Sequence, residues 1–133
     1  LLEYVADPIL LMQRSHLIVA RSGATTVAEI ARLGKAALFM PYPHHKDRQQ
    51  YHNAHALVRL QAAQLIEQDS DLEKSLLLLL ANPNALKEMG ERAKQCSWPD
   101  ASARIASVVA THLQRLPDGY PDELAYERRK SLA

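Results

Sequence analysis

The sequence has 133 residues, of which 47% are hydrophobic, so it fits one domain with a packed core. Sixteen Lys and Arg face 15 Asp and Glu, and the net charge of +1 gives no general electrostatic reason to bind nucleic acid or an anionic membrane. The single cysteine, Cys96, excludes an internal disulfide and a zinc site of several cysteines, and it favours a reducing compartment.

The chain opens on Leu1-Leu2-Glu3 without Met and without a basic stretch, which is not the pattern of a signal peptide. No apolar run approaches the ~18 residues that are needed to cross a bilayer, and the densest run, 76–80, is far shorter. We therefore expect the sequence to begin inside a longer parent protein.

Short apolar runs alternate with helical patterns along the chain. The runs 17–20, 36–40 and 63–66 predict three buried strands. Helical periodicity predicts helices over 25–33, 48–60, 70–80, 83–95 and 100–116. Gly34 suits the end of the first of these helices, a capping box from Ser70 to Glu73 opens the third, and Asn82-Pro83 opens the fourth.

Apolar strands that are each followed by a helix are typical of a parallel sheet covered on both faces. We therefore expect an α/β fold with a Rossmann-like parallel sheet flanked by helices. Three strands are few for a free-standing domain of this class, so a part of a larger domain fits better. Residues 1–116 are expected to form this unit, and 117–133 are expected to form a polar C-terminal tail.

The first candidate binding motif is the stretch 21–29, which lies where the first strand ends and a helix begins. Ligands of open α/β sheets bind in this crevice, and the free N–H groups of a helix start suit a phosphate. Gly23 allows a ligand to approach the backbone, and the Glu29 carboxylate suits ribose hydroxyls. The alternative interpretation is that Thr26 and Glu29 form a capping box.

The second candidate motif is the stretch 41–54, which follows the next strand and should border the same crevice. Gln49 and Gln50 offer donors and acceptors that suit a sugar, although a polar helix start that faces water is the alternative. His44 and His45 are adjacent and have no third ligand, so we expect no metal. Asp47 is predicted to cap the following helix rather than to act as a base.

The string from Ser22 to Glu29, followed by Pro41-Tyr42-Pro43, Arg48-Gln49-Gln50 and Asn53-Ala54, resembles the donor half of the MurG family. The resemblance runs from about Tyr4 to Leu116. These bacterial GT-B glycosyltransferases move N-acetylglucosamine from UDP-GlcNAc to lipid I. The resemblance implies the donor-binding part of an inverting N-acetylglucosaminyltransferase of lipid II synthesis, located in the cytoplasm and peripheral on the inner face of the bacterial cell membrane.

The resemblance also implies roles for individual residues. The backbone of Val5 would meet the uracil, and Glu29 would bind the ribose hydroxyls. The turn beneath the nucleotide and the helix start that holds the diphosphate would comprise Arg21, Ser22, Gly23, Ala24, Thr25 and Thr26. The residues near the sugar would be Gln49, Gln50 and Asn53. The family needs no metal held by an Asp-x-Asp motif, and we expect no metal and no cofactor here.

The sequence also departs from the family pattern. Ala28 stands where a small polar residue is common, and 117–133 has no counterpart. The glycine-rich loops that hold the acceptor lipid and the presumed general base are absent, so the base and the contact with lipid I should lie outside this chain. Three alternatives stay open: a nucleotide-sugar-binding subunit, inactive alone, that works with a separate acceptor-binding chain; a fragment that binds no ligand and serves an interaction; and a sugar-nucleotide epimerase.

Overall fold

The computed structural model describes residues 3–44 and 46–113. The described residues form the strands β1 (Leu17–Ala20), β2 (Ala36–Phe39) and β3 (Ala63–Leu65). Their helices are α1 (Pro8–Arg14), α2 (Ala24–Leu33), α3 (Gln49–Val58), α4 (Asp69–Leu80), α5 (Pro83–Gln95) and α6 (Ala101–Leu113). The chain divides into two units between Pro99 and Asp100, with α6 in the second unit. The expected boundary at 116 and the expected tail lie outside the described residues.

The three strands form one parallel sheet in the order β1-β2-β3. Leu17 pairs with Ala36, and Ala37 pairs with Ala63, so each strand lies beside the next one in the sequence. Because the strands are parallel, their carboxyl ends meet at one edge of the sheet. The expected α/β fold with a Rossmann-like sheet is confirmed.

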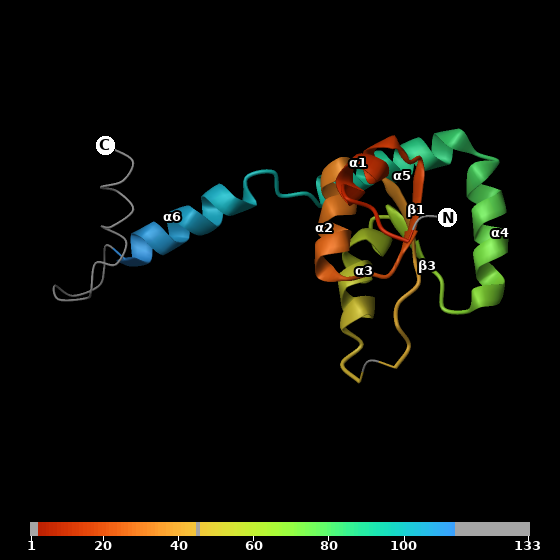
Figure 1. Ribbon diagram of the computed structural model, residues 1–133, viewed down its shortest axis with the longest axis horizontal. Coiled ribbons are helices and arrows are strands. Elements are labelled where there is room, and N and C mark those ends of the chain that lie inside the picture. The colour runs from red at the N-terminus through yellow and green to blue at the C-terminus, as the bar shows by residue number, and fades with distance from the viewer. Residues whose placement is uncertain (1–2, 45, 114–133) are drawn as a thin grey trace. The chain divides into compact units, whose positions relative to one another are not determined.

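Helices cover both faces of this sheet, with α2 and α3 on one side of the strands and α4 on the other (Figure 1). Alternate residues of β2 face the two layers, which is the two-residue period of a strand. Phe39 is buried with Ile30 of α2 and Leu57 of α3, whereas Leu38 is buried with Leu79 of α4. Helix α5 contributes residues to both clusters. The central strand is therefore fixed from both sides.

Two predicted helix boundaries are confirmed by their local chemistry. Gly34 ends α2 in the left-handed conformation, with φ of 65°, which an L residue with a side chain rarely adopts. The Asn82 side chain accepts a hydrogen bond from the Ala85 N–H at 3.1 Å, and Pro83 follows it at the start of α5.

Two features of the helices differ from the prediction. The Ser70–Glu73 capping box is wrong, because α4 already begins at Asp69 and Gln68 precedes it without a side-chain capping bond. Helix α1 was not predicted. It is capped by Asp7, whose carboxylate accepts from the Leu10 N–H at 2.9 Å, and none of its residues is fully buried.

Helix α6 is amphipathic, as its sequence spacing predicts, and its large apolar residues are exposed: Ile105, Val108, Val109 and Leu113. Leu116, which was expected to continue this apolar stripe, lies outside the described residues. Within the part of the chain that the structure describes, no helix is both long enough and apolar enough to cross a membrane.

Candidate functional site

The first part of the candidate site is the start of α2, which follows the carboxyl end of β1. Gly23 is the residue before the helix, and no side chain caps this helix start. The starts of α1 and α5, in contrast, are capped by the side chains of Asp7 and Asn82. The Val27 N–H is bonded to the Gly23 carbonyl at 3.0 Å. The N–H groups of Ala24, Thr25 and Thr26 meet no acceptor among the described residues. These N–H groups and the positive end of the helix are suited to an anion.

The partial positive charge at the start of α2 is not neutralised by side chains of its own first turn. The first turn of α2 contains no acidic residue, whereas the first turn of α4 contains Asp69 and Asp71. Glu29 lies one turn further along and is half-buried. It forms no hydrogen bond or ion pair with any other described residue, so its carboxylate is available to a ligand.

The capping box that Thr26 and Glu29 would form is wrong. Thr26 is the third residue of α2 and not the residue before it, so its hydroxyl is not positioned to cap the helix. This removes the purely structural interpretation of the Thr26–Glu29 spacing.

Gly23 itself is not required by the fold. Its φ of −62° suits any residue, and a Cβ placed there would meet only the Thr26 Oγ1, at 3.8 Å. Open space therefore lies above the turn, at the point where the helix start is uncapped.

The second part of the site is the start of α3, which follows β2 through the loop 40–48. Arg48 precedes the helix in the left-handed conformation, with φ of 49°, and it makes no side-chain capping bond. Its guanidinium lies over the Tyr51 ring, 4.2 Å from the ring centroid. Asp47 caps α3, as predicted, because its carboxylate accepts from the Gln49 N–H at 3.2 Å. It does so from two residues before the helix and not from the residue directly before it.

Hydrogen bonds join the two parts of the site directly. The Ser22 hydroxyl donates to the Gln50 carbonyl oxygen at 2.8 Å, and the Asn53 amide donates to the Ser22 carbonyl oxygen at 3.1 Å. The Gln50 side-chain oxygen in turn accepts from the Tyr42 N–H at 2.8 Å. The turn after β1, the loop after β2 and the first turns of α3 thus form one connected structure.

Arg21 fixes the loop after β2 from the other side. Its guanidinium donates to the carbonyl oxygens of Met40 and Pro41 at 2.7 and 3.0 Å and lies 5.9 Å from the centroid of the Tyr42 ring. Arg21 therefore supports the backbone of this loop, a role that the sequence spacing did not indicate.

The predicted site residues differ in their exposure. Ser22 is fully buried, Gly23, Thr26, Gln50 and Asn53 are half-buried, and Arg21, Ala24, Thr25 and Gln49 are exposed. Val5 is half-buried in the segment before α1, and no hydrogen bond among the described residues links it to the turn after β1. Within the described ranges, no group of three His, Cys, Asp or Glu residues is arranged to hold a metal ion.

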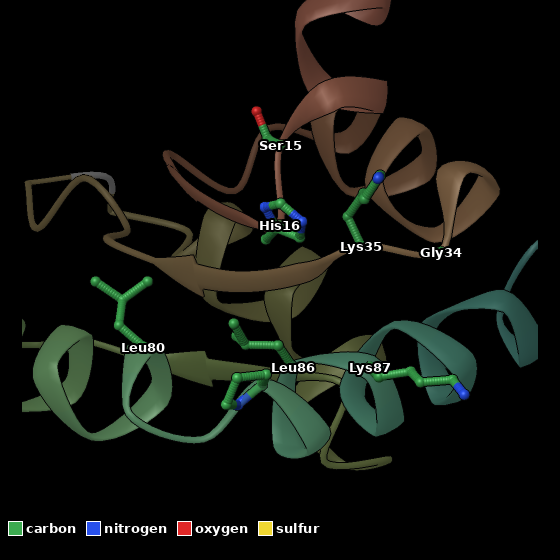
Figure 2. A pocket seen from close by; sticks show the side chains of 8 residues that line it. Ser15, His16, Gly34, Lys35, Leu80, Leu86 and Lys87 are labelled. Atoms are coloured by element: carbon green, nitrogen blue, oxygen red, sulfur yellow. The ribbon is translucent and has the colours of Figure 1, made fainter.

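Of two cavities in the described part of the chain, one adjoins the site. A groove of about 350 Å³ between α2 and α3 includes Ala24 and Asn53 in its lining and therefore adjoins the site. A larger cavity of about 480 Å³ lies at the amino-terminal ends of β1 and β2 and includes His16, Lys35 and Leu86 (Figure 2).

The charged groups of the larger cavity do not converge on a ligand. The Lys35 ammonium donates to the Gln13 carbonyl at 2.7 Å. The Lys87 side chain extends away from His16 in Figure 2 and lies 4.0 Å from the Glu91 carboxylate. We therefore place the candidate site at the other edge of the sheet.

Residues 1–105 match the glycosyltransferase family 28 C-terminal domain. Curated relatives named UDP-N-acetylglucosamine–N-acetylmuramyl-(pentapeptide) pyrophosphoryl-undecaprenol N-acetylglucosamine transferase are similar to this chain. The one from Zymomonas mobilis is 38% identical over 110 residues, which is 80% of this chain and 28% of the relative. The one from Klebsiella pneumoniae is 41% identical over 110 residues, which is 81% of this chain and 31% of the relative.

The crystal structure of Acinetobacter baumannii MurG is also similar, with a TM-score of 0.76 and 30% sequence identity. The match covers 83% of this chain and 33% of that one. This chain thus spans about a third or less of the length of the proteins it matches, and the resemblance to the donor half of the MurG family is confirmed. With the family match covering most of its length, this chain belongs to the glycosyltransferase family 28 C-terminal domain.

Proposed function

We propose that this chain is the donor-binding part of a hexosyltransferase that moves N-acetylglucosamine from UDP-GlcNAc to lipid I in peptidoglycan synthesis. One observation carries the proposal: α2 begins at the carboxyl edge of the sheet with N–H groups that meet no acceptor among the described residues and without an acidic first turn. Such a helix start is suited to a diphosphate. Family membership and the names of the relatives support the same assignment.

The reaction would be the attack of an acceptor sugar hydroxyl on the anomeric carbon, with inversion and with UDP as the leaving group. Negative charge develops on the diphosphate as the glycosidic bond breaks. The N–H groups of Thr25 and Thr26 and the dipole of α2 would stabilise that charge. We assign no general base to this chain and expect it on the acceptor-binding domain.

The remaining contacts are those that the resemblance to the family implies. Glu29 would bind the ribose hydroxyls, and the backbone of Val5 would meet the uracil. The start of α3 would face the sugar, where Gln49 is exposed and the oxygen of Gln50 is already held by the Tyr42 N–H. Gln50 would therefore present its NH₂ group, a donor, to the sugar.

The partners of the parent protein are part of the proposal. Residues 1–116 would bind the donor, 117–133 would form a polar tail, and lipid I would bind to the acceptor domain at the inner face of the bacterial cell membrane. We expect no nucleic acid partner. A separate nucleotide-sugar-binding subunit is not favoured, because the similar relatives are named as transferases.

The experiment is a titration of this chain with UDP, UDP-GlcNAc, UDP-glucose and ADP, followed by NMR. We expect shifts of the Ala24, Thr25 and Thr26 amides with every uridine nucleotide, and tighter binding of UDP-GlcNAc than of UDP-glucose. Equal binding of ADP and UDP would reduce the site to a general phosphate site. Shifts confined to residues away from α2 and α3 would refute the proposal.

A further inference from the structure

The connection between the two parts of the site is more specific than a shared crevice requires. Ser22 belongs to the nucleotide motif, yet its hydroxyl bonds to α3, the helix of the sugar motif. Its side chain is fully buried and cannot touch a ligand in this conformation. Ser22 is also the only buried polar residue within the described ranges.

The bonds run in both directions between the same two segments. Asn53, one turn into α3, donates back to the Ser22 carbonyl at 3.1 Å. The two bonds cross sequence separations of 28 and 31 residues, so neither is a consequence of local helix geometry. A pair of opposed bonds fixes both the distance and the rotation of one segment against the other.

The effect of this pair extends to the loop after β2. Gln50 receives the Ser22 hydroxyl on its main-chain oxygen and the Tyr42 N–H on its side-chain oxygen. A main-chain N–H can only donate, so the atom that faces Tyr42 must be the amide oxygen and not the nitrogen. The direction of the Gln50 NH₂ group is therefore fixed by the Tyr42 N–H.

We propose that Ser22 is a positioning residue, which holds the start of α3 at a fixed distance and rotation from the start of α2 and thereby aligns the sugar contacts with the nucleotide contacts. This inference rests on the proposed function for its ligands. In this inference Ser22, a residue of the nucleotide motif, affects how tightly the sugar is bound.

The test without ligand measures hydrogen exchange of the Tyr42 amide in the full chain by NMR. Ser22→Ala removes the bond to Gln50, loosens the first turn of α3 and should raise the exchange rate of the Tyr42 amide about threefold or more through local opening. Gln50→Ala, which deletes the acceptor, sets the upper limit. The matched control is Ser15→Ala, because the Ser15 hydroxyl also donates to a main-chain oxygen at 2.8 Å, that of Leu11, outside the site.

The test with ligand compares the dissociation constants of UDP and UDP-GlcNAc. UDP should lose little in Ser22→Ala, because the N–H groups of α2 do not depend on the Ser22 hydroxyl. The affinity for UDP-GlcNAc should fall about threefold or more relative to the affinity for UDP. A threefold loss is somewhat less than the net contribution of one average hydrogen bond. Ser15→Ala should leave both constants unchanged.

Asn53→Ala provides a second variant if Ser22→Ala does not fold, because alanine is a good helix former and Asn53 is only half-buried. It should raise the Tyr42 exchange rate in the same way, and only this exchange rate is compared, because Asn53 is itself expected near the sugar. An unchanged Tyr42 exchange rate in both variants, or equal losses for UDP and UDP-GlcNAc in Ser22→Ala, would overturn the inference. If the unsubstituted chain binds no uridine nucleotide, the proposed function fails, while the exchange rates still decide whether Ser22 positions α3.

Discussion

Gly23 and Glu29 are the residues whose chemistry the fold leaves unused. Gly23 adopts a conformation that any residue can adopt and has room for a Cβ, and Glu29 has no partner among the described residues. A residue type that the fold does not need is most simply explained by a ligand. Substitutions at these two positions should therefore separate binding from stability.

Gly23→Ala should weaken UDP binding about tenfold, because a methyl group would stand over the N–H groups that receive the diphosphate. The free energy of unfolding should change by no more than about 1 kcal/mol, because two effects oppose each other. Glycine is preferred over alanine before a helix, whereas alanine reduces the conformational freedom of the unfolded chain. Calorimetric titration and urea unfolding of the same sample measure both. An unchanged affinity for UDP would show that the diphosphate does not lie on this turn.

Glu29→Ala should weaken UDP binding by about 1.5–3 kcal/mol, the range for hydrogen bonds to a charged group. Its thermal midpoint should hardly change, because Glu29 forms no capping box. The control is a ligand and not a protein: 2′-deoxy-UDP lacks one of the hydroxyls and should lose less affinity than UDP. A matching loss for both nucleotides would remove the ribose from the assignment.

Gln49→Ala should reduce the affinity for UDP-GlcNAc by about 0.5–1.5 kcal/mol and leave UDP nearly unaffected. Gln50 permits a finer comparison. Gln50→Glu keeps an acceptor for the Tyr42 N–H but deletes the NH₂ donor, whereas Gln50→Ala deletes both. If Gln50 donates to the sugar, Gln50→Glu should lose UDP-GlcNAc affinity while the Tyr42 amide stays protected.

The backbone of helix α5 lies directly against the backbone at the end of α2, at Gly90. A Cβ at Gly90 would collide with the Gly34 carbonyl oxygen, which belongs to the residue that ends α2. This contact is between two backbones and cannot be relieved by a side-chain rotation. It anchors the far end of the helix whose start forms the candidate site.

Gly90→Ala should therefore destabilise the chain by about 1–3 kcal/mol, the usual cost of overpacking, measured by urea unfolding. Gly23→Ala is the matched substitution at a glycine with space. Equal stability of the two variants would show that α5 can withdraw from α2 without cost.

The molecule as a whole presents its candidate site on an open surface. Arg21, Ala24, Thr25 and Gln49 are exposed, so the described residues enclose only one side of a ligand. We expect this chain to bind UDP with a dissociation constant of about 1 mM, or ~4 kcal/mol. An NMR titration measures this range, and nanomolar affinity of the chain alone would contradict the open site.

Sequence reasoning succeeded where the physical signal is continuous along the chain. The strand at 36–39 is buried on both faces, and its uninterrupted apolar run showed this directly. It failed where a spacing has two meanings, because Thr26 and Glu29 are three residues apart whether the threonine precedes the helix or lies inside it. The Ser22–Gln50 bond could not be predicted at all, since its acceptor is a main-chain oxygen 28 residues away.

The bonds that hold the two loops together share one property. Those of Ser22, Asn53 and Arg21 end on main-chain oxygens, and the bond to Gln50 starts from a main-chain N–H. Every residue type supplies a carbonyl at positions 40 and 41, and every type but proline supplies an N–H at position 42. Evolutionary drift at these three positions can therefore change the side chains of the loop and leave its attachment points intact.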